Sequence, residues 1–193
     1  MILSCGDALI DFVPARLSDG RDALRPVVGG SCLNVAVGVA RLGAPTGFVG
    51  GISTDLFGSM IAAHAQGSDV ELGYATRSPD QTTLAFVRHV GGEAQYAFYD
   101  AETAARKWTF QPGSIPFGTI EAIHVGSTTL IHELGAAETR ALIAATQGAV
   151  TISFDPNCRP NLVHDKTAYC AQMDRFAAAA DLIKMSDVDF DYL

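Results

Sequence analysis

The stretch that decides the fold reads GGSCLNVAVGVARLG and occupies residues 29–43. Two glycines directly precede an apolar run, so we predict a turn followed by a helix from Asn34 to Gly43. A glycine pair lets the backbone approach a ligand, and the helix aims free N–H groups and its positive dipole end at the same spot. The stretch therefore suits the floor of a site for a polar or anionic small molecule. The alternative is an ordinary turn leading into a core helix.

Length and composition describe one globular domain. The 193 residues are enough for one domain with a full core, and an apolar fraction of 48% argues against disorder. A net charge of −8 argues against nucleic acid and against an anionic membrane surface as partners, because both require a basic patch. No stretch approaches the ~20 apolar residues of a membrane span, and Asp7 and Asp11 interrupt the first apolar run, unlike in a signal peptide.

The four cysteines show no metal-binding spacing. They are Cys5, Cys32, Cys158 and Cys170, and no two of them form a C-x-x-C pair or a Cys/His cluster. We interpret them as free, buried thiols, which is typical of a protein in the reducing cytoplasm.

Outward from residues 29–43, strand-like apolar runs alternate with helical patterns. Strands are predicted at 1–5, 46–52, 122–125, 149–154 and 182–185, and helices at 57–66, 136–147, 167–180 and from 186 onward. This alternation favours an α/β fold with a mostly parallel sheet, right-handed crossovers and flanking helices. Residues 14–28, punctuated by Pro14, Gly20 and Pro26, are expected to form a loop.

Residues 82–99 break the alternation. Two β-rich runs, 82–90 and 94–99, flank Gly91 and Gly92, which predicts a β-hairpin. Three interpretations remain open for this hairpin. The first is a flap over a ligand site, the second an edge that pairs with another subunit, and the third an antiparallel edge of the main sheet.

Three clusters of polar residues follow predicted strands. They are Asp7 with Asp11; Asp155 with Asn157 and Arg159; and Ser186 with Asp187 and Asp189. In open α/β sheets, ligands bind beyond the carboxyl ends of the strands, so these clusters are candidate sites. Asp11 lies in an apolar segment, where its carboxylate either faces a cleft and accepts hydrogen bonds from ligand hydroxyls or faces water at the end of a strand.

The two later clusters each allow two interpretations. Arg159 lies between two prolines and its guanidinium suits phosphate oxygens, whereas Asp155 and Asn157 are also typical turn-capping residues. Ser186 is typical of a helix N-cap with acids in the first turn, and the alternative is acids that hold Mg²⁺ through water. Neither a G-x-x-x-x-G-K-[ST] loop nor a G-x-G-x-x-G loop occurs, which argues against a P-loop or a Rossmann dinucleotide site.

As a set, these motifs resemble the ribokinase-like (PfkB) carbohydrate kinases, and among them the fructokinases. The resemblance rests on three segments: Gly29-Gly30…Asn34…Arg41-Leu42-Gly43, continued by Gly50-Gly51 and Asp55-x-Phe57-Gly58; Phe154-Asp155-Pro156-Asn157-x-Arg159-Pro160; and Lys184-x-Ser186-x-x-Asp189. In the last segment, Ser and Asp stand where the family has Asn and Glu. The resemblance covers the whole chain.

The resemblance implies ATP-dependent phosphorylation of a sugar hydroxyl, with fructose as the first expectation and 2-keto-3-deoxygluconate, ribose or a nucleoside as alternatives. It implies substrate binding by Asp11, Gly30, Asn34, Phe98, Asn157 and Arg159. Arg159 would also stabilise the transferred phosphoryl group, because such transfer depends mainly on positioning and charge stabilisation. Ser186 would lie at the nucleotide, and Asp189 would hold Mg²⁺ through water. The resemblance also implies a β lid within about 9–28 and 82–99, through which two copies form a homodimer.

One motif of the family does not occur in the sequence. This is a Gly-Ala-Gly-Asp loop, whose aspartate is the family's catalytic base. The resemblance therefore implies that residues 1–193 form the N-terminal portion of a single ribokinase-like domain, without the base and inactive alone. A non-catalytic sugar-binding or dimerisation fragment is the alternative from another functional class.

Overall fold

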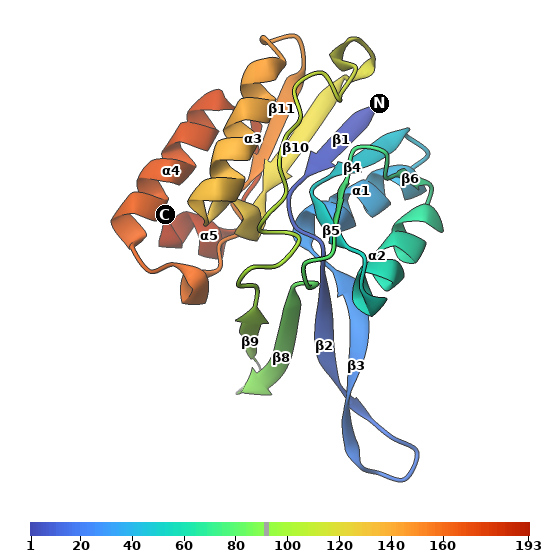
Figure 1. Cartoon of the computed structure of the whole chain (residues 1–193). Helices are drawn as coiled ribbons and strands as arrows, with labels where there is room; N and C mark the ends of the chain where they lie inside the picture. The colour runs from blue at the N-terminus through green and yellow to red at the C-terminus, as the bar shows by residue number, and fades with distance from the viewer. Residues whose placement is uncertain (91–92) are drawn as a thin grey trace.

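Six parallel strands form the central sheet of the computed structural model, which describes residues 1–90 and 93–193 (Figure 1). The strand order is β12-β11-β10-β1-β4-β6, with β1 in the middle between β10 and β4. The strands are β1 (Ile2–Cys5), β4 (Thr46–Val49), β6 (Val70–Glu71), β10 (Ala122–Gly126), β11 (Thr151–Asp155) and β12 (Leu182–Ile183). The predicted α/β fold with a mostly parallel sheet is confirmed.

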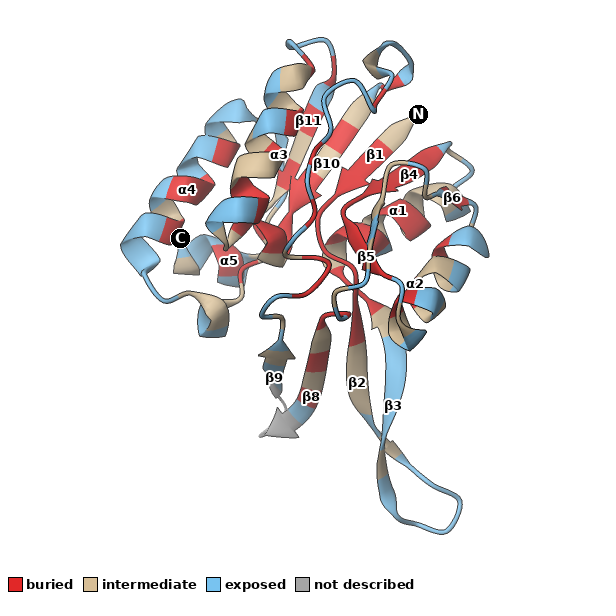
Figure 2. Ribbon diagram, viewed as in Figure 1, coloured by how far each residue is buried: buried red, intermediate tan, exposed pale blue. Residues whose placement is uncertain are grey.

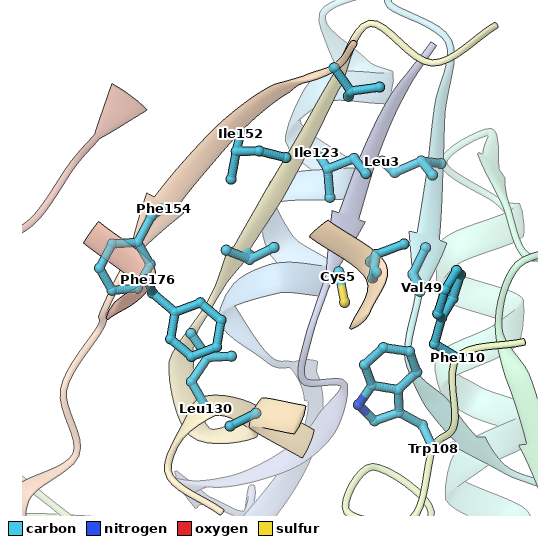
Figure 3. Packing of buried hydrophobic residues seen from close by; sticks show 14 of the residues in the cluster. Leu3, Cys5, Val49, Trp108, Phe110, Ile123, Leu130, Ile152, Phe154 and Phe176 are labelled. Carbon is cyan, nitrogen blue, oxygen red and sulfur yellow. The ribbon is translucent and has the colours of Figure 1, made fainter. Parts of the chain in front are cut away.

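Helices pack on both faces of this sheet, because successive residues of a strand point to opposite sides. Phe48 of β4 packs into a cluster with the first two helices, whereas its neighbour Val49 packs into a second cluster with the next two. The helices are α1 (Ser31–Arg41), α2 (Leu56–Gln66), α3 (Glu133–Ala145) and α4 (Lys166–Ala179). Figure 3 shows the second cluster, where Leu3, Ile123 and Ile152 form a row across three strands. Burial of each such side chain contributes roughly 2 kcal/mol.

A second sheet of four strands projects from the carboxyl ends of the central strands (Figure 1). Its order is β3-β2-β8-β9, and its strands are β2 (Leu9–Arg16), β3 (Asp22–Gly29), β8 (Leu84–Val90) and β9 (Glu93–Tyr99). The two hairpins β2–β3 and β8–β9 join where β2 pairs with β8 at Ile10–Phe12, and the rings of Phe12 and Phe86 stack there at 4.8 Å. Figure 2 shows that the sheet is buried near this junction and exposed farther out. We call it the lid sheet.

The loop predicted for residues 14–28 is wrong, whereas strands are present within about 9–28, where the resemblance places part of the β lid. Residues 14–28 are mostly a β-hairpin and not a loop, because β2 and β3 pair along their whole lengths. Both prolines occupy positions that strands tolerate, since Pro26 lies on the edge strand β3 and Pro14 lies beyond the part of β2 that pairs with β8. The 82–99 hairpin is confirmed, but as part of the lid sheet and not as an edge of the main sheet. The predicted Gly91-Gly92 turn falls outside the described residues.

The strand predicted over 46–52 is interrupted. β4 ends at Val49, and β5 (Gly51–Ser53) pairs with β7 (Thr76–Ser78) in a separate two-stranded sheet. A Cβ at Gly51 would lie 1.8 Å from the carbonyl oxygen of Ala104, so the chain passes here only with glycine. The strands β6 and β7 are too short for a period-2 pattern to predict them.

The remaining elements are short helices. They are η1 (Phe117–Thr119), η2 (Ser127–Leu130), η3 (Pro160–Leu162) and α5 (Asp187–Tyr192). Helix α3 begins at Glu133 and not at 136 as predicted. Every cysteine is free, as predicted, but Cys170 is only partly buried while the other three are fully buried. Within the described residues, no helix has the length and apolar character needed to cross a bilayer.

Candidate functional site

A pocket of about 290 Å³ lies between the lid sheet and the carboxyl ends of the central strands. Its lining residues are Asp7, Leu9, Asp11, Gly30, Ser31, Asn34, Tyr96, Phe98, Thr128, Asn157 and Arg159. Every residue that the sequence analysis assigned to substrate binding is among them. The structure thus brings together segments that are up to about 150 residues apart in the sequence.

The floor of the pocket is built around Asp7, which directly follows β1. Its carboxylate is only 4% exposed and accepts hydrogen bonds from two neighbouring segments. From α1 it accepts Ser31 Oγ at 3.3 Å and the Cys32 N–H at 3.1 Å, and from η2 it accepts Ser127 Oγ at 3.1 Å and Thr128 Oγ1 at 3.4 Å. A buried carboxylate is stable only with such donors, so this cluster holds the floor in one arrangement.

This arrangement corrects the expectation that the N–H groups at the start of α1 are free for a ligand. The Cys32 N–H bonds the Asp7 carboxylate, and the Leu33 N–H bonds the Asp7 carbonyl at 3.2 Å. A carboxylate is itself the anion that a helix N-terminus attracts, so Asp7 occupies this end of α1. Gly30 makes the contact possible, because a Cβ there would lie 2.5 Å from the Asp7 carbonyl oxygen.

Asp11 faces the pocket and is partly buried, which excludes the interpretation of an acid in open water. Burial raises the pKa of Asp11, the nearby Asp7 carboxylate raises it further, and Arg159 lowers it in part. Gly29 lies against this carboxylate, since a Cβ at Gly29 would lie 2.2 Å from Asp11 Oδ2. Gly29, the first glycine of the pair, therefore makes room for Asp11, while Asn34 is exposed at the mouth of the same pocket.

The wall opposite is the loop Asp155–Arg159 that follows β11. Asp155 Oδ1 accepts the Asn157 N–H at 3.1 Å, and its Oδ2 forms a 2.9 Å ion pair with Lys184, so the turn-capping interpretation of Asp155 is confirmed. Asn157 has a φ of 40°, in the left-handed region that few non-glycine residues adopt. Its side-chain Oδ1 is buried and has no hydrogen-bond partner among the described residues. This oxygen is available to accept a hydrogen bond from a ligand hydroxyl.

Arg159 is held by its own loop and by the lid sheet. Its Nη1 donates to the carbonyl oxygens of Asn157 at 3.1 Å and Cys158 at 2.8 Å. Its guanidinium carbon lies 5.8 Å from the centre of the Tyr96 ring, at cation–π distance. Asn161 Nδ2 also donates to the Tyr96 carbonyl at 2.9 Å. The loop and the lid sheet therefore touch directly beside the pocket.

The lid wall of the pocket consists of Tyr96 and Phe98, whose rings stack at 5.8 Å. Behind Phe98 lies a small cavity of about 20 Å³, bordered by Asp100, Arg106 and His132. Asp100 Oδ2 lies 2.7 Å from Arg106 Nη2 and 3.3 Å from His132 Nε2. Burial alone would raise the pKa of Asp100, but His132 and Arg106 lower it below its ordinary value. This ion-pair cluster fixes the end of β9 and was not found by sequence reasoning, because its members carry no motif.

The third polar cluster does not reach the pocket. Ser186 is the N-cap of α5, as one interpretation predicted, and forms a capping box with Asp189. Asp189 Oδ2 accepts the Ser186 hydroxyl at 2.8 Å, and its Oδ1 accepts the Cys158 N–H at 2.8 Å. Burial alone would raise the pKa of Asp189, but the hydrogen bonds from Ser186 and Cys158 hold it below its ordinary value.

These contacts involve the two residues that the resemblance places at the nucleotide, Ser186, and at Mg²⁺, Asp189. Both carboxylate oxygens of Asp189 and the hydroxyl of Ser186 are engaged within the protein. In the described part of the chain, no group of three or more His, Cys, Asp or Glu side chains is arranged to hold a metal ion. The role of Asp189 at Mg²⁺ through water stays a prediction.

Sequence reasoning missed several lining residues of the pocket. Asp7 was placed in a polar cluster but given no role, and Thr128 was left without one although it follows a predicted strand at the end where ligands bind. The position of Thr128 after a predicted strand could therefore have identified it as a lining residue. For Ser31 and Tyr96 the sequence offered no such indication, because only packing brings them to the pocket.

Comparisons with known proteins agree with this geometry. A model described as "pfkB family carbohydrate kinase" matches residues 1–193. A fructokinase from Rhizobium leguminosarum bv. trifolii is 38% identical over 192 residues, which cover 100% of this chain and 59% of that protein. A crystal structure of a fructokinase from Xylella fastidiosa is 32% identical, with a TM-score of 0.89, and is matched over 100% of this chain and 61% of its own. That fructokinase with bound ATP gives a TM-score of 0.88 at 31% identity, covering 100% of this chain and 59% of that one. The chain thus spans 59–61% of the length of these relatives.

Proposed function

Because the chain belongs to the pfkB family of carbohydrate kinases, we propose that it carries the sugar-binding part of an enzyme that transfers a phosphoryl group from ATP to a hydroxyl of fructose. The observation that carries the proposal is the pocket of about 290 Å³, in which hydroxyl-binding side chains from the ends of several strands converge. The fructokinase names of the relatives support fructose, and the ATP-bound fructokinase from Xylella fastidiosa supports ATP.

The charge of the pocket favours a neutral sugar over an acidic one. Two carboxylates, Asp7 and Asp11, line it against one cation, Arg159, and Asp7 also occupies the start of α1. A sugar acid such as 2-keto-3-deoxygluconate would bring a third carboxylate into this space, and like charges at close range repel. Fructose carries no charged group, and its hydroxyl groups can donate hydrogen bonds to the carboxylates.

Each side chain has a role that follows from its contacts. Asp11 and the unpartnered Oδ1 of Asn157 accept hydrogen bonds from sugar hydroxyls, and Asn34 at the mouth binds a further hydroxyl. Phe98 covers an apolar face of the sugar and excludes water. Arg159, beside the reacting hydroxyl, stabilises negative charge on the transferred phosphoryl group. ATP supplies that phosphoryl group when it is bound.

We further propose that two copies associate through the lid sheet. The lid sheet and its β2–β3 turn expose several large apolar side chains: Leu17, Leu24, Val27 and Tyr99. Apolar side chains gathered on one projecting element are typical of an association surface.

The test of the proposed function is a panel of acceptors offered with ATP to the protein as it occurs. We expect ADP release that depends on fructose, with 2-keto-3-deoxygluconate, ribose and adenosine at least tenfold poorer in kcat/KM. The Asp11→Asn variant, which keeps the size of the side chain, is the matched control and should lose fructose-dependent turnover. Turnover that is best with the sugar acid would contradict the charge argument.

A non-catalytic sugar-binding role is the second candidate. It is favoured by the side chains of Asp11, Asn34 and Asn157, which line the pocket and can hydrogen-bond a sugar whether or not a phosphoryl group is transferred. Fructose binding measured by calorimetry, without any release of ADP, is the result that supports this role over the kinase.

A further inference from the structure

The side chain of Asp189 reaches out of its own helix toward the sugar pocket. It is 6% exposed, and its Oδ1 accepts the backbone N–H of Cys158 at 2.8 Å, across 31 residues of sequence. Cys158 lies between Asn157 and Arg159, which both line the pocket. Asp189 itself does not line the pocket. Its contact is therefore with the back of the loop whose front forms a wall of the pocket.

The loop depends on support from behind. Asn157 holds a left-handed φ of 40°, and a non-glycine residue in that region costs of order 1 kcal/mol or more. Arg159 is oriented by bonds from its Nη1 to the carbonyl oxygens of Asn157 and Cys158. A shift of the Cys158 backbone would thus move the guanidinium together with the unpartnered amide of Asn157.

Two contacts anchor Cys158. Its backbone N–H bonds Asp189, and its Sγ receives the hydroxyl of the buried Tyr169 in α4 at 3.4 Å. The first contact is the stronger one, because a hydrogen bond to a carboxylate is about twice as strong as a neutral one and sulfur is a weak acceptor. The other oxygen of Asp189 is occupied by Ser186, so the carboxylate has both oxygens committed inside the protein.

We propose that Asp189 is a positioning residue for the sugar pocket, which holds the Asn157–Arg159 loop in its binding conformation through the Cys158 N–H. This inference rests on the proposed function, since it takes the pocket to be the sugar site. It differs from the expectation that Asp189 acts on Mg²⁺. A positioning residue affects sugar binding in the absence of metal and nucleotide, whereas a metal-linked residue affects only steps that involve the metal.

The first experiment measures fructose affinity by calorimetry in EDTA, without nucleotide. Asp189→Ala should weaken binding roughly tenfold, which corresponds to the loss of one charge-assisted hydrogen bond. Asp189→Asn keeps an acceptor oxygen for the Cys158 N–H and should recover most of the affinity. Unchanged affinity in Asp189→Ala would overturn the proposal, and so would an Asp189→Asn variant as weak as Asp189→Ala.

Two control variants separate positioning from helix capping. Ser186→Ala removes the N-cap hydroxyl of α5 but leaves the bond between Asp189 and Cys158, so it should bind fructose like the wild type. Asp187→Asn removes a charge from the same turn, where the carboxylate contacts only the Val188 N–H within the described residues. If Ser186→Ala weakens fructose binding as much as Asp189→Ala, the effect comes from the helix and the proposal fails.

A second measurement needs no ligand. Hydrogen exchange of the Cys158 amide reports its anchor directly, and we expect strong protection in the wild type, at least tenfold faster exchange in Asp189→Asn and no change in Ser186→Ala. An unprotected Cys158 amide in the wild type would contradict the proposal that its hydrogen bond to Asp189 anchors the loop. Absence of fructose binding in the wild type would instead contradict the proposed function, so the two failures are distinguishable.

Discussion

Two buried aspartates hold two sides of the same pocket, Asp7 its floor and Asp189 its loop wall, and they do so in different ways. Asp7 and Asp189 are 4% and 6% exposed, and each accepts a backbone N–H from a segment that lines the pocket. Asp7 also lines the pocket itself and gathers three hydroxyl groups, whereas Asp189 stays behind its wall and is shared with one short helix. Asp7 therefore both stabilises the pocket and lines it, whereas Asp189 acts only through the loop that it supports.

The position of each residue in the sheet explains this difference. Asp7 follows β1, which lies in the middle of the sheet, so neighbouring segments α1 and η2 surround it with donors. Asp189 lies in the short helix α5 and accepts from only one other segment among the described residues, at the Cys158 N–H. Segments with few buried contacts open more easily than central ones. We therefore expect the floor of the pocket to be rigid and the loop wall to be adaptable.

The largest expected effect on stability comes from the floor of the pocket, which Asp7 holds. Asp7→Ala leaves the Cys32 N–H and three hydroxyls without their acceptor and should lower the free energy of unfolding by roughly 3 kcal/mol. Urea denaturation measures this. Ser127→Ala, which removes one donor and keeps the carboxylate, is the matched control and should cost about 0.5–1 kcal/mol. A loss below about 1 kcal/mol in Asp7→Ala would show that the floor is not held by this cluster.

The next largest effect concerns Asp11, where we expect sugar binding to be lost without a loss of stability. Asp11→Ala should weaken fructose binding roughly 10- to 100-fold, because bonds to a charged acceptor are lost, while the protein stays folded. Its stability at neutral pH should be equal to or above that of the wild type, since the ionised carboxylate is held in an unfavourable, partly buried place. Calorimetry and denaturation measure the two properties in parallel. Unchanged sugar affinity would mean that the site lies elsewhere.

The smallest effect is a difference in pH dependence. The pKa of Asp11 is raised above 3.8 on folding, so its contribution to stability is fully present below pH 3.8 and is lost as pH rises through the folded pKa. The pKa of Asp189 is lowered below 3.8, so its contribution is present above pH 3.8 and is lost as pH falls through the folded pKa. We expect Asp11→Asn to gain stability relative to the wild type as pH rises, and Asp189→Asn to regain its deficit as pH falls. Parallel stability curves for the two variants would contradict these opposite signs.

Part of the fold and site follows from local pattern alone. The alternation of strands and helices and the 82–99 hairpin were predicted, and the N-cap at Ser186 was one of two interpretations, because each depends on residues close together in the sequence. The pocket residues Asp11, Asn34 and Arg159 were identified through a family resemblance carried by short motifs.

Other features depended on packing between distant segments. The local pattern predicted a loop at 14–28 because its prolines are typical of loops, and only the family resemblance placed strands within about 9–28. The prolines are tolerated because no neighbouring strand pairs at their positions on the far side. The expected free N–H groups of α1 were wrong because Asp7 lies 25 residues before Cys32 yet reaches its N–H. Neither arrangement leaves a periodic signal in the sequence.

The sequence by itself determined the parallel α/β architecture and the polar residues at the strand ends, since hydrophobic period and turn residues act over a few positions. Only the tertiary structure decided which of those polar groups meet. It paired Asp7 with α1 and η2, and it joined Asp189 to Cys158 instead of to the pocket. The physical reason is that a buried carboxylate takes whichever donors the packed backbone brings within about 3 Å, and that proximity exists only once the sheet and its helices are assembled.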